Sequence, residues 1–186
     1  MAYLSNPTET KAVLDMFGFS FAKKYGQNFL IDGNIVSNIV KNAGITKEDT
    51  VLEIGPGIGT MTQVLCEQAK NVIAVEIDKR LIDVLTFTLR DYDNVTVINS
   101  DILKCNIEEL CKQYSSNGRL KVVANLPYYI TTPIIMELLE KNNNSVIESI
   151  TVMIQKEVAK RICAAPGTAD FGAFSLLCQY YAHCEY

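Results

Sequence analysis

The sequence predicts an α/β fold, a mostly parallel sheet with flanking helices. Short runs rich in β-branched residues alternate with segments whose apolar residues recur at helical spacing. A glycine-rich turn, residues 53–59, joins the first strand-like run to a helix-like segment. Hydrophobic residues make up 48% of the 186 residues and charged residues 20%, which fits one soluble globular domain.

Two helices are expected before the sheet. The first covers residues 8–17 with Thr8 as its N-cap, and the second covers residues 34–43 and ends at Gly44. A basic loop, residues 23–30, separates them.

Strands and helices then alternate, as expected for strands that run parallel with helices covering both faces. The carboxyl ends of such strands meet at one edge of the sheet, where ligands bind. The expected strands are residues 50–54, 72–76, 95–99, 120–124 and 147–154, and the expected helices are residues 60–69, 79–89, 132–140, 157–164 and 174–181.

Composition excludes several classes of function. A net charge of −4 argues against a general nucleic-acid binder, whose affinity depends on neutralising phosphates. The six cysteines form no Cys-x-x-Cys pair and His183 is the only histidine, so we expect no metal site and read the cysteines as buried free thiols. Without a signal peptide or an apolar run of about 18 residues, the chain is expected in the cytosol, with no membrane partner.

The glycine turn has the position of a cofactor site. Glycines let the backbone approach a ligand, and the following helix N-terminus offers unpaired N–H groups. The spacing Gly55-x-Gly57-x-Gly59 departs from the G-x-G-x-x-G pattern of dinucleotide sites, and Pro56 removes one backbone donor. By itself, such a turn is about as often a simple tight connection between strand and helix as it is a cofactor site.

Two acids strengthen the cofactor interpretation. Glu76 follows Gly55 by 21 positions at the end of the second strand, close to the spacing at which an acid binds ribose hydroxyls. Asp101 follows the third strand and can accept a hydrogen bond from an adenine amine. Either acid alone is more often a helix cap or a solvated loop residue. The turn and both acids together favour a nucleoside-cofactor site.

The tetrad Asn125-Leu126-Pro127-Tyr128 follows the fourth strand and suits chemistry on a flat amine. The Asn125 side-chain oxygen and the Leu126 carbonyl can accept the two hydrogens of an exocyclic amine, which aims its lone pair at a methyl donor. Pro127 stiffens the backbone and Tyr128 offers a ring for stacking. The alternative is a purely structural role, in which the strand ends in a turn and the tyrosine only packs against its neighbours.

Several segments, taken together, resemble the ribosomal RNA adenine N6,N6-dimethyltransferases of the small subunit. They occur in the family's order over nearly the whole chain, which makes the match specific. The matching segments are residues 24–32, 51–59, 75–78, 100–103, 125–133 and 171–175.

The resemblance implies a Rossmann-like methyltransferase fold with S-adenosylmethionine as methyl donor and S-adenosylhomocysteine as product. It implies that Glu76 binds the ribose, Asp101 the adenine amine, and that Asn125 stands between donor and acceptor. Residues 1–45 are expected to form a helical and basic-loop segment that closes over the cofactor, and residues 46–186 the catalytic core. The implied cofactor-binding residues are Asn28, Leu30, Gly55, Gly57, Glu76, Ile77, Asp101, Ile102 and Asn125, and the catalytic residues are Asn125, Leu126, Pro127 and Tyr128.

The resemblance further implies dimethylation of two adjacent adenosines near the 3′ end of small-subunit rRNA. The partner expected is therefore small-subunit rRNA or the immature subunit, with Lys23 and Lys24 as candidate RNA contacts and a monomeric enzyme. Family members usually continue for roughly another 80–100 residues, the size of a small helical domain and the last strands. We therefore expect a catalytic core cut from a longer protein.

Three alternatives stay open on the sequence. A sister class methylates one adenosine of large-subunit rRNA and confers antibiotic resistance. A nicotinamide-dependent oxidoreductase would share the sheet but not the tetrad. A non-catalytic module that only binds ribosomal RNA during assembly is the third.

Overall fold

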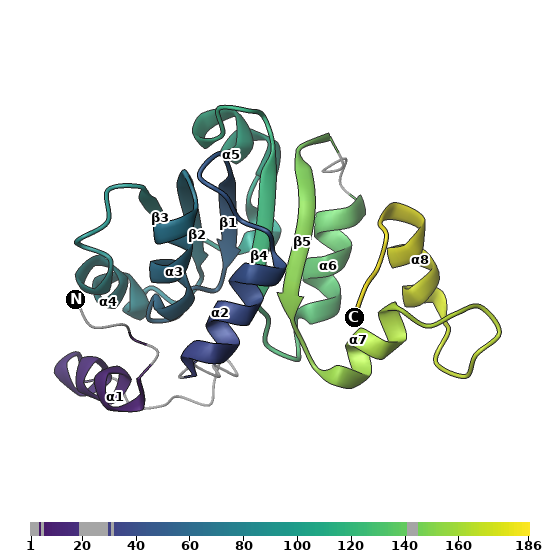
Figure 1. Ribbon diagram of the computed structural model, residues 1–186, viewed down its shortest axis with the longest axis horizontal. Helices are drawn as coiled ribbons and strands as arrows, with labels where there is room; N and C mark the ends of the chain where they lie inside the picture. Colours follow the sequence, from purple (N-terminus) through teal and green to yellow (C-terminus); the bar gives the residue numbers. More distant parts are fainter. Residues whose placement is uncertain (1–3, 5, 19–29, 31, 141–144) are drawn as a thin grey trace.

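The computed structural model describes residues 4, 6–18, 30, 32–140 and 145–186. Five parallel strands form one sheet in the order β3-β2-β1-β4-β5 (Figure 1). The strands are β1 (Thr50–Ile54), β2 (Asn71–Glu76), β3 (Val95–Asn99), β4 (Leu120–Asn125) and β5 (Ile147–Met153).

Helices cover both faces of the sheet in the part of the chain that the structure describes (Figure 1). Helices α2 and α3 pack on one face, and α5, α6 and α8 on the other. The helices are α1 (Pro7–Met16), α2 (Gly33–Asn42), α3 (Thr60–Gln68), α4 (Arg80–Thr88), α5 (Ile107–Tyr114), α6 (Thr131–Glu140), α7 (Lys156–Ile162) and α8 (Ala173–Tyr181), with a 3₁₀ turn at Ile102–Lys104.

Strand β1 lies in the middle of the sheet and is buried along its whole length. Successive side chains of a strand point to opposite faces. Val51 accordingly joins the core under α2 and α3, whereas Leu52 joins the core under α5 and α6. Burial on both faces explains why the parallel strands read as nearly continuous apolar runs.

The predicted alternation of strands and helices is confirmed; most bounds shift by one or two residues, and three differences are larger or bear on the site. Asn6, not Thr8, caps α1, and its side-chain oxygen accepts a 2.9 Å bond from the Thr8 amide. Strand β4 runs to Asn125, one residue further than expected, so the first tetrad residue pairs with Met153 inside the sheet. Helix α5 was not expected from the sequence, although Asn106 is a typical N-cap and accepts a hydrogen bond from Glu109.

All six cysteines are free thiols, as expected. The expected burial is confirmed for Cys66, Cys111 and Cys178 only, because the other three are half-buried. Burial raises the pKa of the Cys66 thiol to about 12, which makes it unreactive at neutral pH. In the described residues no helix is long and apolar enough to cross a bilayer.

Lys121 connects neighbouring segments at the edge of the sheet where the strands begin (the amino edge), opposite the candidate site. Its Nζ donates to the Gly44 carbonyl at 2.8 Å and to Asp49 Oδ2 at 3.0 Å. Burial opposes ionisation of Asp49, but the Lys121 and Thr46 hydrogen bonds outweigh it and lower the pKa of the carboxyl. These hydrogen bonds hold the end of α2 against β4. They stabilise the sheet whose opposite, carboxyl edge carries the candidate site.

Candidate active site

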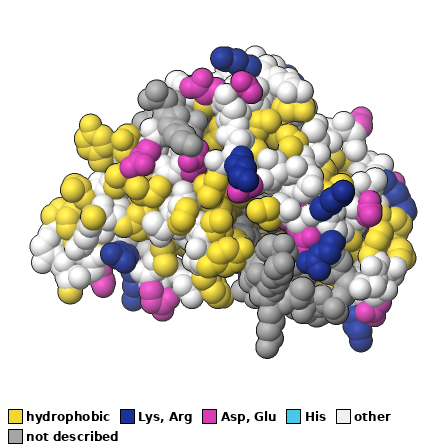
Figure 2. Space-filling model, turned by 180° about the vertical axis from the view of Figure 1, so that it is seen from behind, with side chains coloured by type: hydrophobic (Ala, Val, Ile, Leu, Met, Phe, Trp, Pro, Cys, Tyr) yellow, Lys and Arg dark blue, Asp and Glu magenta, His cyan; other side chains and the backbone are white. Residues whose placement is uncertain are grey.

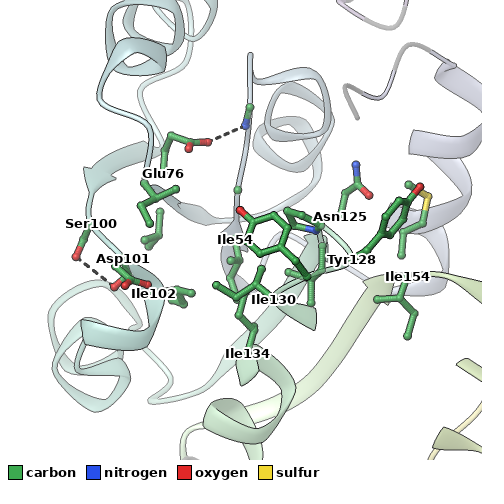
Figure 3. A pocket seen from close by; sticks show the side chains of 18 of the residues that line it. Ile54, Glu76, Ser100, Asp101, Ile102, Asn125, Tyr128, Ile130, Ile134 and Ile154 are labelled. Carbon is green, nitrogen blue, oxygen red and sulfur yellow. Dashed lines mark hydrogen bonds between the residues drawn. The ribbon is translucent and has the colours of Figure 1, made fainter. Parts of the chain in front are cut away.

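A cavity of about 300 Å³ opens at the carboxyl edge of the sheet. Residues at or just beyond the ends of all five strands line it, together with the start of α6. Figure 3 shows Glu76 and Asp101 on one side of this cavity and Asn125 and Tyr128 on the other. The size is at the lower end of the range for small-molecule sites.

The glycine turn has the conformation that its sequence demands. Gly55 has a φ of +70°, and a Cβ built on it would meet nothing within 4 Å, so its backbone borders open space. Gly59 has a φ of +93°, and a Cβ there would lie 3.0 Å from Thr88 Oγ1. Gly55 therefore gives the cavity a backbone surface, whereas Gly59 allows α3 to start close against α4.

The Glu76 carboxylate is held between two loops. Its Oε1 accepts a 2.8 Å bond from the Asp78 amide, and its Oε2 accepts a 3.2 Å bond from the Gly57 amide. Burial is the main cause of a raised Glu76 pKa, against which the backbone hydrogen bonds act. Each oxygen retains a second lone pair, so the carboxylate can still accept hydrogen bonds from a ligand.

Asp101 lies at the tip of the neighbouring strand β3. Its Oδ1 accepts a 3.1 Å bond from the Leu103 amide, which makes Asp101 the N-cap of the 3₁₀ turn. The side chain of Asn99 donates a 2.8 Å bond to the Glu76 carbonyl and fixes the two strand tips to each other. The two acids that the sequence singled out thus share one edge of one cavity.

Glu53, the first residue of the segment 53–59, lies in β1 and is not part of the cavity wall. Its side chain is fully buried, and neither oxygen has a hydrogen-bond partner among the described residues. Burial raises the pKa of this carboxyl to about 8, against the smaller opposing effect of the nearby Thr62 hydroxyl. At neutral pH Glu53 is therefore mainly uncharged beneath the glycine turn.

The tetrad lies at the middle of the edge. Asn125 is half-buried at the end of β4, and Leu126 is anchored by its amide, which donates a 3.1 Å bond to the Met153 carbonyl. The Pro127 carbonyl accepts bonds from the Ile130 amide and the Thr131 hydroxyl. Among the described residues we find no such bond to the Leu126 carbonyl, and Tyr128 is 61% exposed.

Most of the predicted site residues meet in this one cavity. Its lining includes Gly55, Gly57, Glu76, Ile77, Asp101, Ile102 and the tetrad 125–128. Leu30 is not in the lining and packs against the core under α2 and α3. Asn28, Lys23 and Lys24 lie outside the described residues, so the roles given to them stay predictions.

The lining also contains residues that sequence reasoning missed. Met153 ends β5, and Ile154 and Gln155 follow it; the rule that ligands bind at the carboxyl ends of parallel strands would have found them. Tyr129 is 61% exposed beside the tetrad, and Ile134 comes from α6. These side chains make much of the wall apolar. In the described part of the chain no group of His, Cys, Asp and Glu could hold a metal ion.

The sheet order and the cavity at its carboxyl edge define the class of protein, a Rossmann-like S-adenosylmethionine-dependent methyltransferase fold. A dimethyladenosine transferase from Plasmodium falciparum is 29% identical with a TM-score of 0.67, over 78% of this chain and 50% of that one. The 23S rRNA methyltransferase ErmE is 32% identical with a TM-score of 0.62, over 72% of this chain and 50% of that one.

The profile described as "Ribosomal RNA adenine dimethylase" matches residues 18–186, and the chain belongs to this family. A "Ribosomal RNA small subunit methyltransferase A" from Lachnoclostridium phytofermentans is 58% identical over 98% of this chain and 62% of its own length. The protein of the same name from Alkaliphilus metalliredigens is 50% identical over all of this chain and 64% of its own length. The chain thus spans about three-fifths of these relatives.

Proposed function

We propose that this chain is the catalytic portion of an S-adenosylmethionine-dependent enzyme that dimethylates the N6 amines of two adjacent adenosines near the 3′ end of small-subunit ribosomal RNA. One observation carries the proposal. In a chain of the adenine dimethylase family, Glu76 and Asp101 share a single cavity with the tetrad 125–128. The names of the relatives at 58% and 50% identity support the small subunit over the large one.

The acid half of the cavity fits a nucleoside cofactor. Glu76 is held by the Gly57 and Asp78 amides, and its remaining lone pairs can accept hydrogen bonds from two ribose hydroxyls. Asp101 Oδ1 is bound to the Leu103 amide, so Oδ2 is the oxygen that would accept from an adenine amine. The open space at Gly55 accommodates the methionine portion. When bound, S-adenosylmethionine supplies an electrophilic methyl group on a sulfonium.

The tetrad half of the cavity fits the acceptor amine. The lone pair of an adenine N6 is delocalised into the ring, so the nitrogen must become more tetrahedral to react. The Asn125 side-chain oxygen and the Leu126 carbonyl accept its two hydrogens and favour that shape. The exposed ring of Tyr128 stacks on the base, a contact worth about 1–3 kcal/mol.

Positioning therefore carries most of the catalysis in this proposal. No strong base is required, because the nitrogen becomes acidic once it is alkylated and its proton can pass to water. The target base has to leave its stack to reach the cavity, as for other enzymes that modify bases. We further propose that the enzyme acts as a monomer in the cytoplasm, and that residues 1–45 close over the cofactor while residues 46–186 form the core.

Calorimetric titration with S-adenosylhomocysteine and, separately, with NAD tests the class of cofactor. The proposal predicts saturable binding of S-adenosylhomocysteine and none of NAD. The reverse result would support an oxidoreductase. Incubating the protein with immature small subunits and methyl-labelled cofactor tests the reaction. RNA binding without transfer of label would support a non-catalytic assembly module.

A further inference from the structure

The two halves of the cavity differ in charge. The residues lining it from the β1–β3 side include Glu76 and Asp101. The residues lining it from β4, β5 and α6 include no aspartate or glutamate among those described. The same division is visible in Figure 3, where Glu76 and Asp101 lie opposite Asn125 and Tyr128. A polyanion approaching the cavity is repelled by one half and not by the other.

Helix α7 follows directly after the residues that line the uncharged half of the cavity, and it carries three cations. Gln155 lines the cavity at the end of β5, and α7 begins at the next residue, Lys156. Lys156, Lys160 and Arg161 are all exposed, and Glu157 is the one acid on this helix. No salt bridge joins these three cations to another described residue. They are therefore available to an external anion.

This group of cations contrasts with the acidic balance of the whole chain. The chain as a whole carries a net charge of −4. On the face shown in Figure 2, the basic and acidic side chains are interspersed and do not form one broad basic field. A nucleic acid would therefore depend on a local group of cations, and α7 places three of them beside the cavity.

Resting on the proposed function, we propose that Lys156, Lys160 and Arg161 bind the phosphates that flank the target adenosine, so that the RNA strand enters over the β4–β5 half of the edge. Asn125 pairs with Met153, and neighbouring strands lie about 4.8 Å apart. The start of α7 is thus close to the place where the tetrad holds the base. Phosphate contacts of this kind fix the register of a strand without reading its sequence.

The test measures binding of an RNA hairpin with two unpaired adenosines to the chain saturated with S-adenosylhomocysteine, by fluorescence anisotropy over a series of KCl concentrations. The variant is K156Q/K160Q/R161Q. The matched control is K41Q/K112Q/R119Q, which removes three exposed cations near the opposite edge of the sheet and changes the net charge equally. Titration with S-adenosylhomocysteine checks that both variants keep the cofactor site.

We expect the α7 variant to bind the hairpin at least about tenfold more weakly at low salt, and the slope of log affinity against log salt to fall by about 2. The control should stay within about twofold of the wild type. Equal weakening of both variants, or a wild-type chain that binds the hairpin no better than the α7 variant, overturns the inference. Loss of S-adenosylhomocysteine binding by the wild type would instead refute the proposed function.

Discussion

The backbone amide of Gly57 donates a 3.2 Å hydrogen bond to Glu76 Oε2, which joins the turn after β1 to the acid at the end of β2. The Asp78 amide holds the other oxygen at 2.8 Å. The carboxylate is therefore oriented before any ligand arrives, and little conformational entropy remains to be lost when a ribose binds.

Replacing this acid should weaken cofactor binding in proportion to the hydrogen bonds lost. We expect Glu76→Ala to reduce the affinity for S-adenosylhomocysteine by about 1–3 kcal/mol, measured by calorimetry. Glu148→Ala is the matched control, because Glu148 is half-exposed near the amino edge of the sheet. An unchanged affinity in Glu76→Ala would remove this acid from the ribose site.

Asn125 should matter for turnover much more than for cofactor binding. Asn125→Ala removes one acceptor of the target amine, which at comparable sites lowers kcat by about 10²–10³. Affinity for S-adenosylhomocysteine should stay within a few-fold of the wild type. Transfer of labelled methyl to immature small subunits measures the first quantity and calorimetry the second, with Asn117→Ala as control. Equal losses in both would show that Asn125 supports structure instead.

The sequence predicted the parts of this site that depend on strand ends. Gly55, Glu76 and Asp101 each follow an apolar run, and the structure places those runs on the adjacent strands β1, β2 and β3. Their placement at one edge could be predicted because parallel strands end at the same edge whatever the details of helix packing.

The pH dependence of stability should reveal Glu53. Its folded-state pKa of about 8 is above its ordinary value of 4.5, because burial disfavours the charged carboxylate. The unfolded chain therefore releases this proton first. The contribution of Glu53 to the free energy of unfolding is fully present below about pH 4.5. It is lost as pH rises toward 8, with a slope of at most about 1.4 kcal/mol per pH unit.

Thermal melts of Glu53→Gln between pH 5 and 8 test whether Glu53 causes this pH dependence of stability. The variant should lose part of the slope of the wild type. The part due to Glu76, whose pKa is also raised, should remain. A slope identical to that of the wild type would show that Glu53 is already ionised in the folded protein.

Lys121 should contribute to the free energy of unfolding and not to cofactor binding. Lys121→Met leaves the Asp49 carboxylate, whose side chain is only 10% exposed, without its cationic partner. We expect a loss of about 1–3 kcal/mol in the free energy of unfolding, measured with denaturant. Affinity for S-adenosylhomocysteine should be unchanged, because Lys121 lies at the amino edge of the sheet. A large loss of affinity would mean that the two edges are coupled.

Other features could not be predicted, because they depend on tertiary packing. The raised pKa of Glu53 arises mainly from burial, with a smaller contribution from the nearby Glu76 on β2, and both depend on how the elements pack around this side chain. The apolar wall formed by Ile134 and Met153 depends on how α6 and β5 meet at the edge. Helix α5 is different, since its N-cap and apolar spacing were present in the sequence.

A crystal structure of this chain with S-adenosylhomocysteine tests the central claim most directly. The account predicts the ribose on the Glu76 carboxylate, the adenine beside Asp101, and the sulfur facing the space between Asn125 and Tyr128. A ligand bound elsewhere, or a saturated crystal with this cavity empty, would contradict it.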